Sequence, residues 1–251
     1  MKKICCLLSG LLLLALPLAA QDSIAQGDAA YDRFDNAAAL KHYQAAYAAD
    51  STNCIAAWKV SRAHVDIGEF AGKEAQRTNY YAGEKFARKA VALCPGDDMT
   101  HLTLAIAVGR VALMEGGKKK VELSKEVKAE AEAAIKLNPR NDVAYHVLAR
   151  WNREVANLSG ILKAFAKVLY GGLPPASREK AAELFQKAVE LNPGYVNHHF
   201  ELGITYEDMG KPELARAEYE KAIALPRTVF SDDVHKKEAQ ERLDKIIKKM
   251  K

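Results

Sequence analysis

Apolar residues recur every three or four positions along most of the chain, and the helices that this spacing predicts end on a repeated signal. The signal is an alanine and an aliphatic residue followed by a leucine and a proline, and it stands at 90–95, 134–139, 188–193 and 222–226, with a fainter copy at 46–51. The intervals between the ends of these segments are 44, 44, 54 and 33 residues. They fit a period of about 34 with insertions of about 10, 10 and 20. The sequence therefore predicts five helical hairpins.

The last of these hairpins shows what the repeat requires physically. Gly203 and Ala215 are small enough to let two helices approach, Tyr206 and Tyr219 fill the space between adjacent hairpins, and Pro226 ends the second helix. This copy resembles the tetratricopeptide consensus. We expect an all-α, tetratricopeptide-type helical-hairpin solenoid over residues 21–230.

A further helix is predicted over 231–251. It begins with Ser231, Asp232 and Asp233 and ends in Lys248-Lys249, so its charges oppose the helix dipole at both ends. A polar outer face of this kind is typical of a C-terminal capping helix, because the last hairpin otherwise leaves its apolar side in water.

The insertions fall inside the second, third and fourth hairpins. The first two are expected between the helices of their hairpins, around 70–80 and 116–120. The third, at 157–175, predicts an extra amphipathic helix that Gly171-Gly172 and Pro174-Pro175 interrupt. Its apolar stripe favours packing on the neighbouring repeat, and a membrane surface or a partner's groove is the alternative. The stripe comprises Leu158, Ile161, Leu162, Phe165, Val168 and Leu169.

Two segments resemble the regulator of microtubule dynamics family of tetratricopeptide proteins. They are residues 57–64, AWKVSRAH, and residues 144–177, from AYHVLARW through LYGGLPPAS. The resemblance covers roughly residues 25–230, and it implies a helical solenoid that associates with other proteins, in its named case microtubules.

The first 20 residues predict a cleaved signal peptide. Lys2 and Lys3 precede an apolar stretch over 4–16, and small residues lead up to Ala20, where we expect cleavage. The stretch is too short to span a bilayer, and no stable membrane insertion is expected elsewhere in the chain. The mature protein is therefore predicted to be exported, either periplasmic or secreted, which separates it from cytoplasmic tubulin.

Charge and motifs narrow the functional classes. Loss of Lys2 and Lys3 lowers the formal net charge from +5 to +3, and no aromatic residues interleave with the basic tail, so nucleic acid is not an expected partner. Catalytic signatures and phosphate-binding glycine loops are absent from the sequence, and adjacent His198-His199 cannot share a metal ion from one helix face. We predict a protein that is not an enzyme and has no cofactor or metal. The sequence leaves its oligomeric state open.

Exposed positions on the first helix of each hairpin are the expected binding surface, because these helices build the concave face of such repeats. Arginines there favour an acidic peptide or a free carboxylate, since a guanidinium can meet a carboxylate with two hydrogen bonds. Pairing of these arginines with intramolecular acids is the alternative. The predicted groove contains Trp58, Arg62, Asp66, Leu102, Ile106, Arg110, His146, Arg150 and Arg153.

Two structural questions depend on where the helices end. Cys54 begins one helix of the second hairpin and Cys94 ends the other, so both thiols lie at the same end, where a disulfide or two free thiols are both compatible with the sequence. Trp151 is expected to pack against the inserted helix rather than to contact a ligand.

Two functions remain after these exclusions. The favoured one is an extracytoplasmic scaffold that binds protein or peptide on its concave face. The alternative is a lipid or small-molecule carrier whose apolar cavity is covered by the inserted helix. An enclosed apolar pocket beneath 157–175 favours the carrier, and an open polar groove favours the scaffold.

Overall fold

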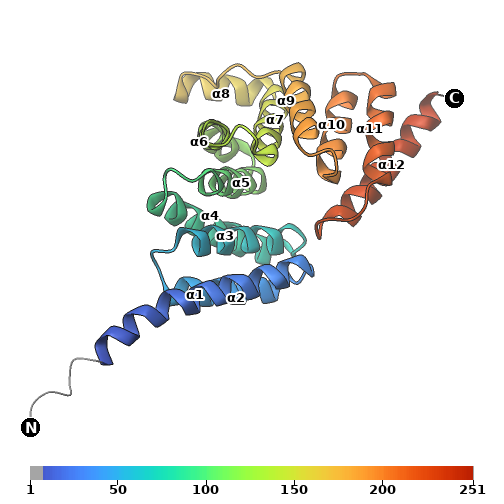
Figure 1. Cartoon of the computed structure of the whole chain (residues 1–251). Helices are drawn as coiled ribbons and strands as arrows, with labels where there is room; N and C mark the ends of the chain where they lie inside the picture. The colour runs from blue at the N-terminus through green and yellow to red at the C-terminus, as the bar shows by residue number, and fades with distance from the viewer. Residues whose placement is uncertain (1–7, 251) are drawn as a thin grey trace, which may run out of the picture. The chain divides into compact units, whose positions relative to one another are not determined.

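The computed structural model describes residues 8–250, and every regular element in that range is an α-helix (Figure 1). The predicted all-α fold class is confirmed. The helices are α1 (Leu8–Asp32), α2 (Asn36–Ala49), α3 (Cys54–Glu69), α4 (Lys73–Leu93), α5 (Asp98–Glu115), α6 (Gly117–Leu137), α7 (Asp142–Ala156), α8 (Gly160–Tyr170), α9 (Arg178–Leu191), α10 (Val196–Asp208), α11 (Pro212–Ala224) and α12 (Asp232–Met250).

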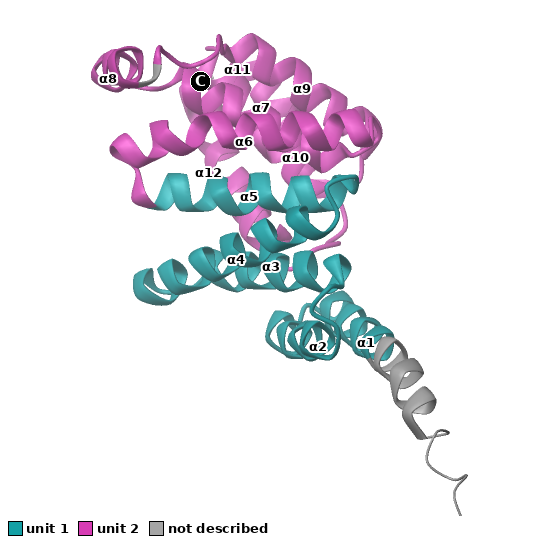
Figure 2. Cartoon of the chain, turned by 90° about the vertical axis from the view of Figure 1, so that its left-hand side faces the viewer, with its two compact units in different colours: residues 1–114 teal, residues 115–251 magenta. Residues whose placement is uncertain are grey.

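The chain divides into two compact units, residues 1–114 and 115–251 (Figure 2). In unit 1, α1 packs against α2, α2 against α3, and α3 against α4. In unit 2, α7 packs against α9 and α10 against α11, while α12 covers α11 and part of α10. Helix α6 contacts α7 and α8 within the same unit.

The repeated sequence signal marks the helix ends because it combines a stop with a cap. Helices α4, α6 and α9 are followed by the C-cap residues Cys94, Asn138 and Asn192, and each cap directly precedes a proline that cannot continue the hydrogen-bond ladder. The next helix then begins with a capped turn. The Asn141 side chain, for example, accepts a hydrogen bond of 3.0 Å from the Ala144 amide at the start of α7.

In the first and the fifth hairpins, close contact between a glycine and a tyrosine holds the two helices together. A Cβ atom added at Gly27 would lie 2.4 Å from the ring of Tyr43, and one added at Gly203 would lie 2.4 Å from the ring of Tyr219. Both tyrosines are fully buried. The two hairpins therefore use the same packing, although the first matches the consensus less completely.

The first two insertions lie inside helices, which differs from the sequence expectation. Helix α3 ends at Glu69 and α4 already begins at Lys73, so residues 73–80 are helical. Helices α4 and α6 each contain 21 residues, whereas α2 and α9 each contain 14. Good helix formers fill these segments, so the added residues lengthen the second helix by about two turns rather than forming a loop.

The inserted helix is present as α8, but most of its apolar stripe is not buried. Leu158, just before the helix, is 9% exposed, whereas Ile161 is 83% exposed, Val168 81% and Leu169 59%. The expectation that the stripe packs on a neighbouring repeat is therefore wrong for these three residues. Helix α8 nevertheless packs against α6, and Ala166 within it is fully buried.

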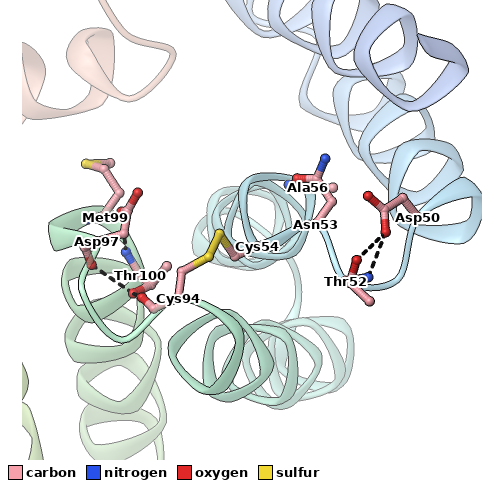
Figure 3. Close-up of a disulfide and its surroundings, with 9 residues drawn as sticks. All are labelled: Asp50, Thr52, Asn53, Cys54, Ala56, Cys94, Asp97, Met99 and Thr100. Carbon is pink, nitrogen blue, oxygen red and sulfur yellow. Dashed lines mark hydrogen bonds between the residues drawn. A yellow bond between two sulfur atoms is a disulfide. The ribbon is translucent and has the colours of Figure 1, made fainter. Parts of the chain in front are cut away.

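A disulfide joins Cys54 to Cys94, whose Cα atoms lie 6.0 Å apart (Figure 3). It connects the start of α3 to the residue after α4, at the end of this hairpin opposite the turn at 70–72. Thr100 lies beside it, and its hydroxyl donates a 3.0 Å hydrogen bond to the Cys94 carbonyl.

The disulfide predicts a large stability difference between the oxidised and the cysteine-free chain. The two cysteines are 40 residues apart, and a loop of this length corresponds to about 4 kcal/mol in the loop-entropy model. Replacing both Cys54 and Cys94 by serine should lower the free energy of unfolding by an amount of this order, measured by denaturant titration. Peptide mapping without reductant should recover residues 54 and 94 in one linked species. Alkylation of both thiols in the native protein would show that the bridge is absent.

The contact between Gly203 and Tyr219 predicts a cost for one added methyl group. Gly203→Ala should lower the free energy of unfolding by about 1–3 kcal/mol because the ring must move, even though alanine favours a helix more than glycine does. Gly160→Ala is the matched control, since a Cβ there meets nothing within 4 Å. Equal stability of the two variants would argue against close helix approach at Gly203.

Candidate functional site

The nine residues of the predicted groove come from both units. Six belong to unit 1 and three belong to unit 2, where they all lie on α7. In unit 1, α3 provides Trp58, Arg62 and Asp66, and α5 provides Leu102, Ile106 and Arg110; in unit 2, α7 provides His146, Arg150 and Arg153.

Several of these residues are interior rather than exposed. Leu102 is 4% exposed, and His146 and Arg153 are each 5% exposed. Trp58 is also buried, at 9% exposed. The expectation that these residues line an open surface is therefore wrong for all four.

In unit 1, Arg62 is the centre of an aromatic and charged cluster. Its guanidinium carbon lies 3.8 Å from the ring centre of Tyr31 on α1 and 5.2 Å from that of Trp58. One terminal nitrogen donates a 3.2 Å hydrogen bond to the Tyr43 hydroxyl. The Nε atom is buried and has no hydrogen-bond partner in the structure. The two aromatic rings therefore contact the guanidinium while this donor remains unused.

Asp66 lies one helical turn from Arg62 and is an unusual carboxyl group. Burial raises its pKa to about 7, and the charge of Glu69 acts in the same direction, while Arg62 and Arg110 oppose the shift. The Tyr31 hydroxyl hydrogen-bonds to it, yet its Oδ2 atom is buried without a partner. The cluster therefore contains an unused donor and an unused acceptor.

Charged neighbours extend this cluster along α3. The Lys59 ammonium group lies 2.5 Å from an Asp28 carboxylate oxygen, and the Tyr43 hydroxyl donates a 2.7 Å hydrogen bond to the same oxygen. Burial opposes ionisation of Asp28, but these hydrogen bonds outweigh it and lower its pKa. At the other end, Arg110 pairs with Glu69 at 2.5 Å.

In unit 2, the arginines of α7 share one buried carboxylate. Glu201 on α10 forms an ion pair with Arg153 and lies 3.4 Å from the Nε atom of Arg150. Burial opposes its ionisation, but the two arginines hold the pKa of Glu201 well below its usual range. Arg153 also donates a 2.9 Å hydrogen bond to the Glu201 carbonyl. This arrangement is an internal ion-pair network.

A chain of buried hydrogen bonds runs beside that network. Nε2 of His198 lies 2.8 Å from Oδ2 of Asp142, and Nδ1 of His198 lies 2.9 Å from Nδ1 of His146. The carboxylate accepts from His198 Nε2, so a neutral His198 uses Nδ1 to accept from His146. Burial lowers the pKa of both histidines, and the charge of His198 lowers that of His146 further. Both imidazoles are therefore neutral near pH 7.

Trp151 is predicted to pack against the inserted helix, but the structure places it against α6. Its indole nitrogen donates to the Ser124 carbonyl at 2.7 Å and lies 2.9 Å from the Ser124 hydroxyl. An indole N–H that is buried needs such a partner, and α6 supplies it because that helix extends beside α7.

Sequence reasoning missed the partners that complete both clusters. In unit 1 these are Asp28 and Tyr31, and in unit 2 they are Asp142, His198 and Glu201. All of them lie on α1, α7 and α10, which are first helices of their hairpins. Comparing opposite charges on successive first helices would have identified the Arg153–Glu201 pair. Among the described residues, no group of three or more His, Cys, Asp or Glu side chains is placed to hold a metal ion.

These hairpins define a tetratricopeptide-type helical repeat protein. A thermophilic TPR protein from Thermus thermophilus has a TM-score of 0.66 to this structure, covers 89% of this chain and 100% of its own, and is 17% identical in sequence. MamA from Desulfovibrio magneticus RS-1, from residue 41 onward, has a TM-score of 0.51, with 16% identity over 82% of this chain and 94% of its own.

The family model for regulator of microtubule dynamics protein 1-3 matches residues 23–251, and the chain belongs to this family. Human regulator of microtubule dynamics protein 2 is 31% identical over 77% of this chain and 47% of its own length. The mouse protein 1 is 28% identical over 74% of this chain and 62% of its own. The chain thus spans about half to two thirds of these relatives.

No helix in the described part of the chain is long and apolar enough to cross a membrane.

The buried histidines predict acid sensitivity of the fold. In the unfolded chain they take up protons near pH 6.5, whereas the folded chain holds them neutral to lower pH. The unfolded state therefore binds more protons, and the free energy of unfolding should fall as pH drops below 6.5. His146→Gln should reduce this slope by up to about 1.4 kcal/mol per pH unit.

Denaturant titrations between pH 7.5 and 5 measure that slope. His42→Gln on α2 is the matched control, because His42 lies outside the buried histidine pair, and it should keep the wild-type slope. An unchanged slope in His146→Gln would show that His146 does not couple protonation to folding.

Proposed function

We propose that this protein is an extracytoplasmic scaffold that binds a peptide carboxylate through the Arg62 cluster on the first helices of unit 1. The observation that carries the proposal is the stacked guanidinium of Arg62, whose buried Nε has no partner. A carboxylate ligand would satisfy this donor, and a guanidinium in contact with aromatic rings loses little freedom when it binds.

Comparison of the four predicted arginines supports the choice of Arg62. Arg110 pairs with Glu69, and Arg150 and Arg153 share Glu201. These three guanidiniums therefore serve internal ion pairs, as the alternative explanation anticipated. The proposed site retains Trp58, Arg62 and Asp66 as its centre, with Ile106 and Arg110 on the adjacent α5 as secondary members.

The predicted signal peptide and the disulfide support the extracytoplasmic part of the proposal. The signal peptide predicted over 1–20 lies partly outside the described residues, since the structure describes the chain from Leu8. The disulfide between Cys54 and Cys94 is typical of an oxidising compartment. The relatives are named for microtubule dynamics, but an exported chain would not meet tubulin. We therefore propose a different protein or peptide partner for the same kind of fold, and no catalytic role.

The carrier alternative receives less support. It requires an enclosed apolar pocket beneath 157–175. The cavity there is an open cleft of about 640 Å³, and its lining includes Lys163, Lys167 and Arg178. Three cationic side chains at an open cleft do not suit the buried apolar tail of a carried lipid.

The proposal predicts discrimination between peptide C-termini. Fluorescein-labelled random tetrapeptides with a free C-terminal carboxylate should bind about tenfold more tightly than the same peptides with a C-terminal amide, because a charged hydrogen bond is worth about 1.5–3 kcal/mol. Arg62→Ala should remove this difference, and Arg62→Lys should restore it only in part. Fluorescence anisotropy measures the affinities.

Arg88→Ala is the matched control, because Arg88 is an arginine on the second helix of the same hairpin and pairs with Glu84.

Affinity for the carboxylate peptides should also fall as pH rises from 6 to 8, since Asp66 then becomes anionic beside the ligand, and Asp66→Asn should abolish that fall. Equal affinity of the acid and amide peptides for the wild-type chain would refute the proposal.

A further inference from the structure

Helix α8 is amphipathic, and its apolar side has no cover within its unit. Ile161 and Val168, two turns apart on one side of the helix, are 83% and 81% exposed, and Leu169 beside them is 59% exposed. The structure shows this helix at the edge of unit 2 (Figure 2). Side chains of this size are rarely left in water as a contiguous group without a function.

The position of α8 is fixed by other contacts, so the exposure is not the result of a loose segment. The Ser159 side chain caps its first turn, and Gly171 ends it in a left-handed conformation at φ 67°. Leu158 and Ala166 are buried, and α6 packs against the helix. The helix therefore presents Ile161, Val168 and Leu169 outward as a defined face.

The charged side chains on the side of α8 opposite its apolar face are both basic. Lys163 and Lys167 are the charged residues of α8, and both line the open cleft behind it together with Arg178 and Glu179. Lys118 on α6 adds a further cation, with its ammonium group 5.0 Å from the ring centre of Phe165. The surroundings of the helix are thus mostly basic, with Glu179 as the acid in the cleft lining.

We infer that α8 docks the protein onto an anionic phospholipid surface. A helix with an apolar face and a basic polar face lies in the bilayer interface, where the apolar side chains enter the acyl boundary and the lysines remain at the level of the phosphates. The excess of positive charge around α8 selects an anionic bilayer over a neutral one. This docking is peripheral and independent of the carboxylate site in unit 1.

Vesicle flotation with the full chain tests the inference. The probe is vesicles of phosphatidylglycerol and phosphatidylcholine in equal amounts, compared with pure phosphatidylcholine. The double variant Ile161→Ser and Val168→Ser should lower the partition coefficient by about tenfold or more, because each side chain loses apolar contact. Lys163→Gln with Lys167→Gln should lower it by about 25-fold, at about fivefold for each lysine.

Two matched controls belong to the same unit. Leu214→Ser removes an exposed apolar side chain on α11 that is 47% exposed, and Lys245→Gln removes an exposed lysine on α12. Neither should change the partitioning. If the lysine variant lost partitioning onto the anionic vesicles and the serine variant did not, the inference would be overturned. A change in molar mass of the serine variant by light scattering, without vesicles, would instead assign the face to a second copy of the chain and also overturn it.

A second measurement locates the contact, because the apolar stretch at 4–16 could itself bind vesicles. Val168→Trp adds an indole on the proposed face, while the natural Trp58 and Trp151 are buried. Brominated lipids in the anionic vesicles should quench Val168→Trp at least twofold more than Leu214→Trp. Equal quenching of the two variants, or absence of quenching in both, would show that α8 does not enter the bilayer.

Discussion

A single amphipathic helix has too little surface to keep one side dry, so every hairpin in this protein depends on close approach of its two helices. In the first and the fifth hairpins that approach needs a position without a side chain. Gly27 and Gly203 provide it, and a tyrosine ring lies where a Cβ atom would otherwise stand. Dispersion contacts at this distance and the burial of a whole aromatic ring then stabilise the pair. The helix ends follow from the same constraint, because each hairpin must stop where its partner stops, and a proline after Cys94, Asn138 or Asn192 achieves this.

The two units use their first helices differently. In unit 2, Glu201 pairs with two arginines and Asp142 accepts a hydrogen bond from His198, so the buried polar groups satisfy one another and hold α7 against α10. In unit 1, aromatic rings surround Arg62, and the polar atoms of Arg62 and Asp66 are not fully paired. Buried polar groups that lack partners are costly, and a ligand that completes the set is the explanation proposed here for Arg62 and Asp66. The same repeat therefore supports an interior network in unit 2 and the proposed binding site in unit 1.

The hairpins were predictable from sequence because their signals are local. The leucine and proline at the end of each second helix and the glycine-tyrosine spacing in the last hairpin depend on residues close in the chain. Side-chain partners were not predictable in the same way. Arg153 and Glu201 are 48 residues apart, and their meeting depends on the packing of α7 against α10. The exposure of Ile161 and Val168 was also missed, because an apolar stripe shows that a helix has two unlike faces but does not show whether the chain covers the apolar one.

The bond between Cys54 and Cys94 turns the second hairpin into a closed covalent ring, with the turn at 70–72 at one end and the two sulfur atoms at the other. The bond prevents α3 and α4 from separating at the end of the hairpin that has no connecting turn. A protease that cuts the turn would produce a nicked molecule whose halves stay tethered until a reductant arrives. A cut in this turn would thus leave the residues around Arg62 attached to their neighbours.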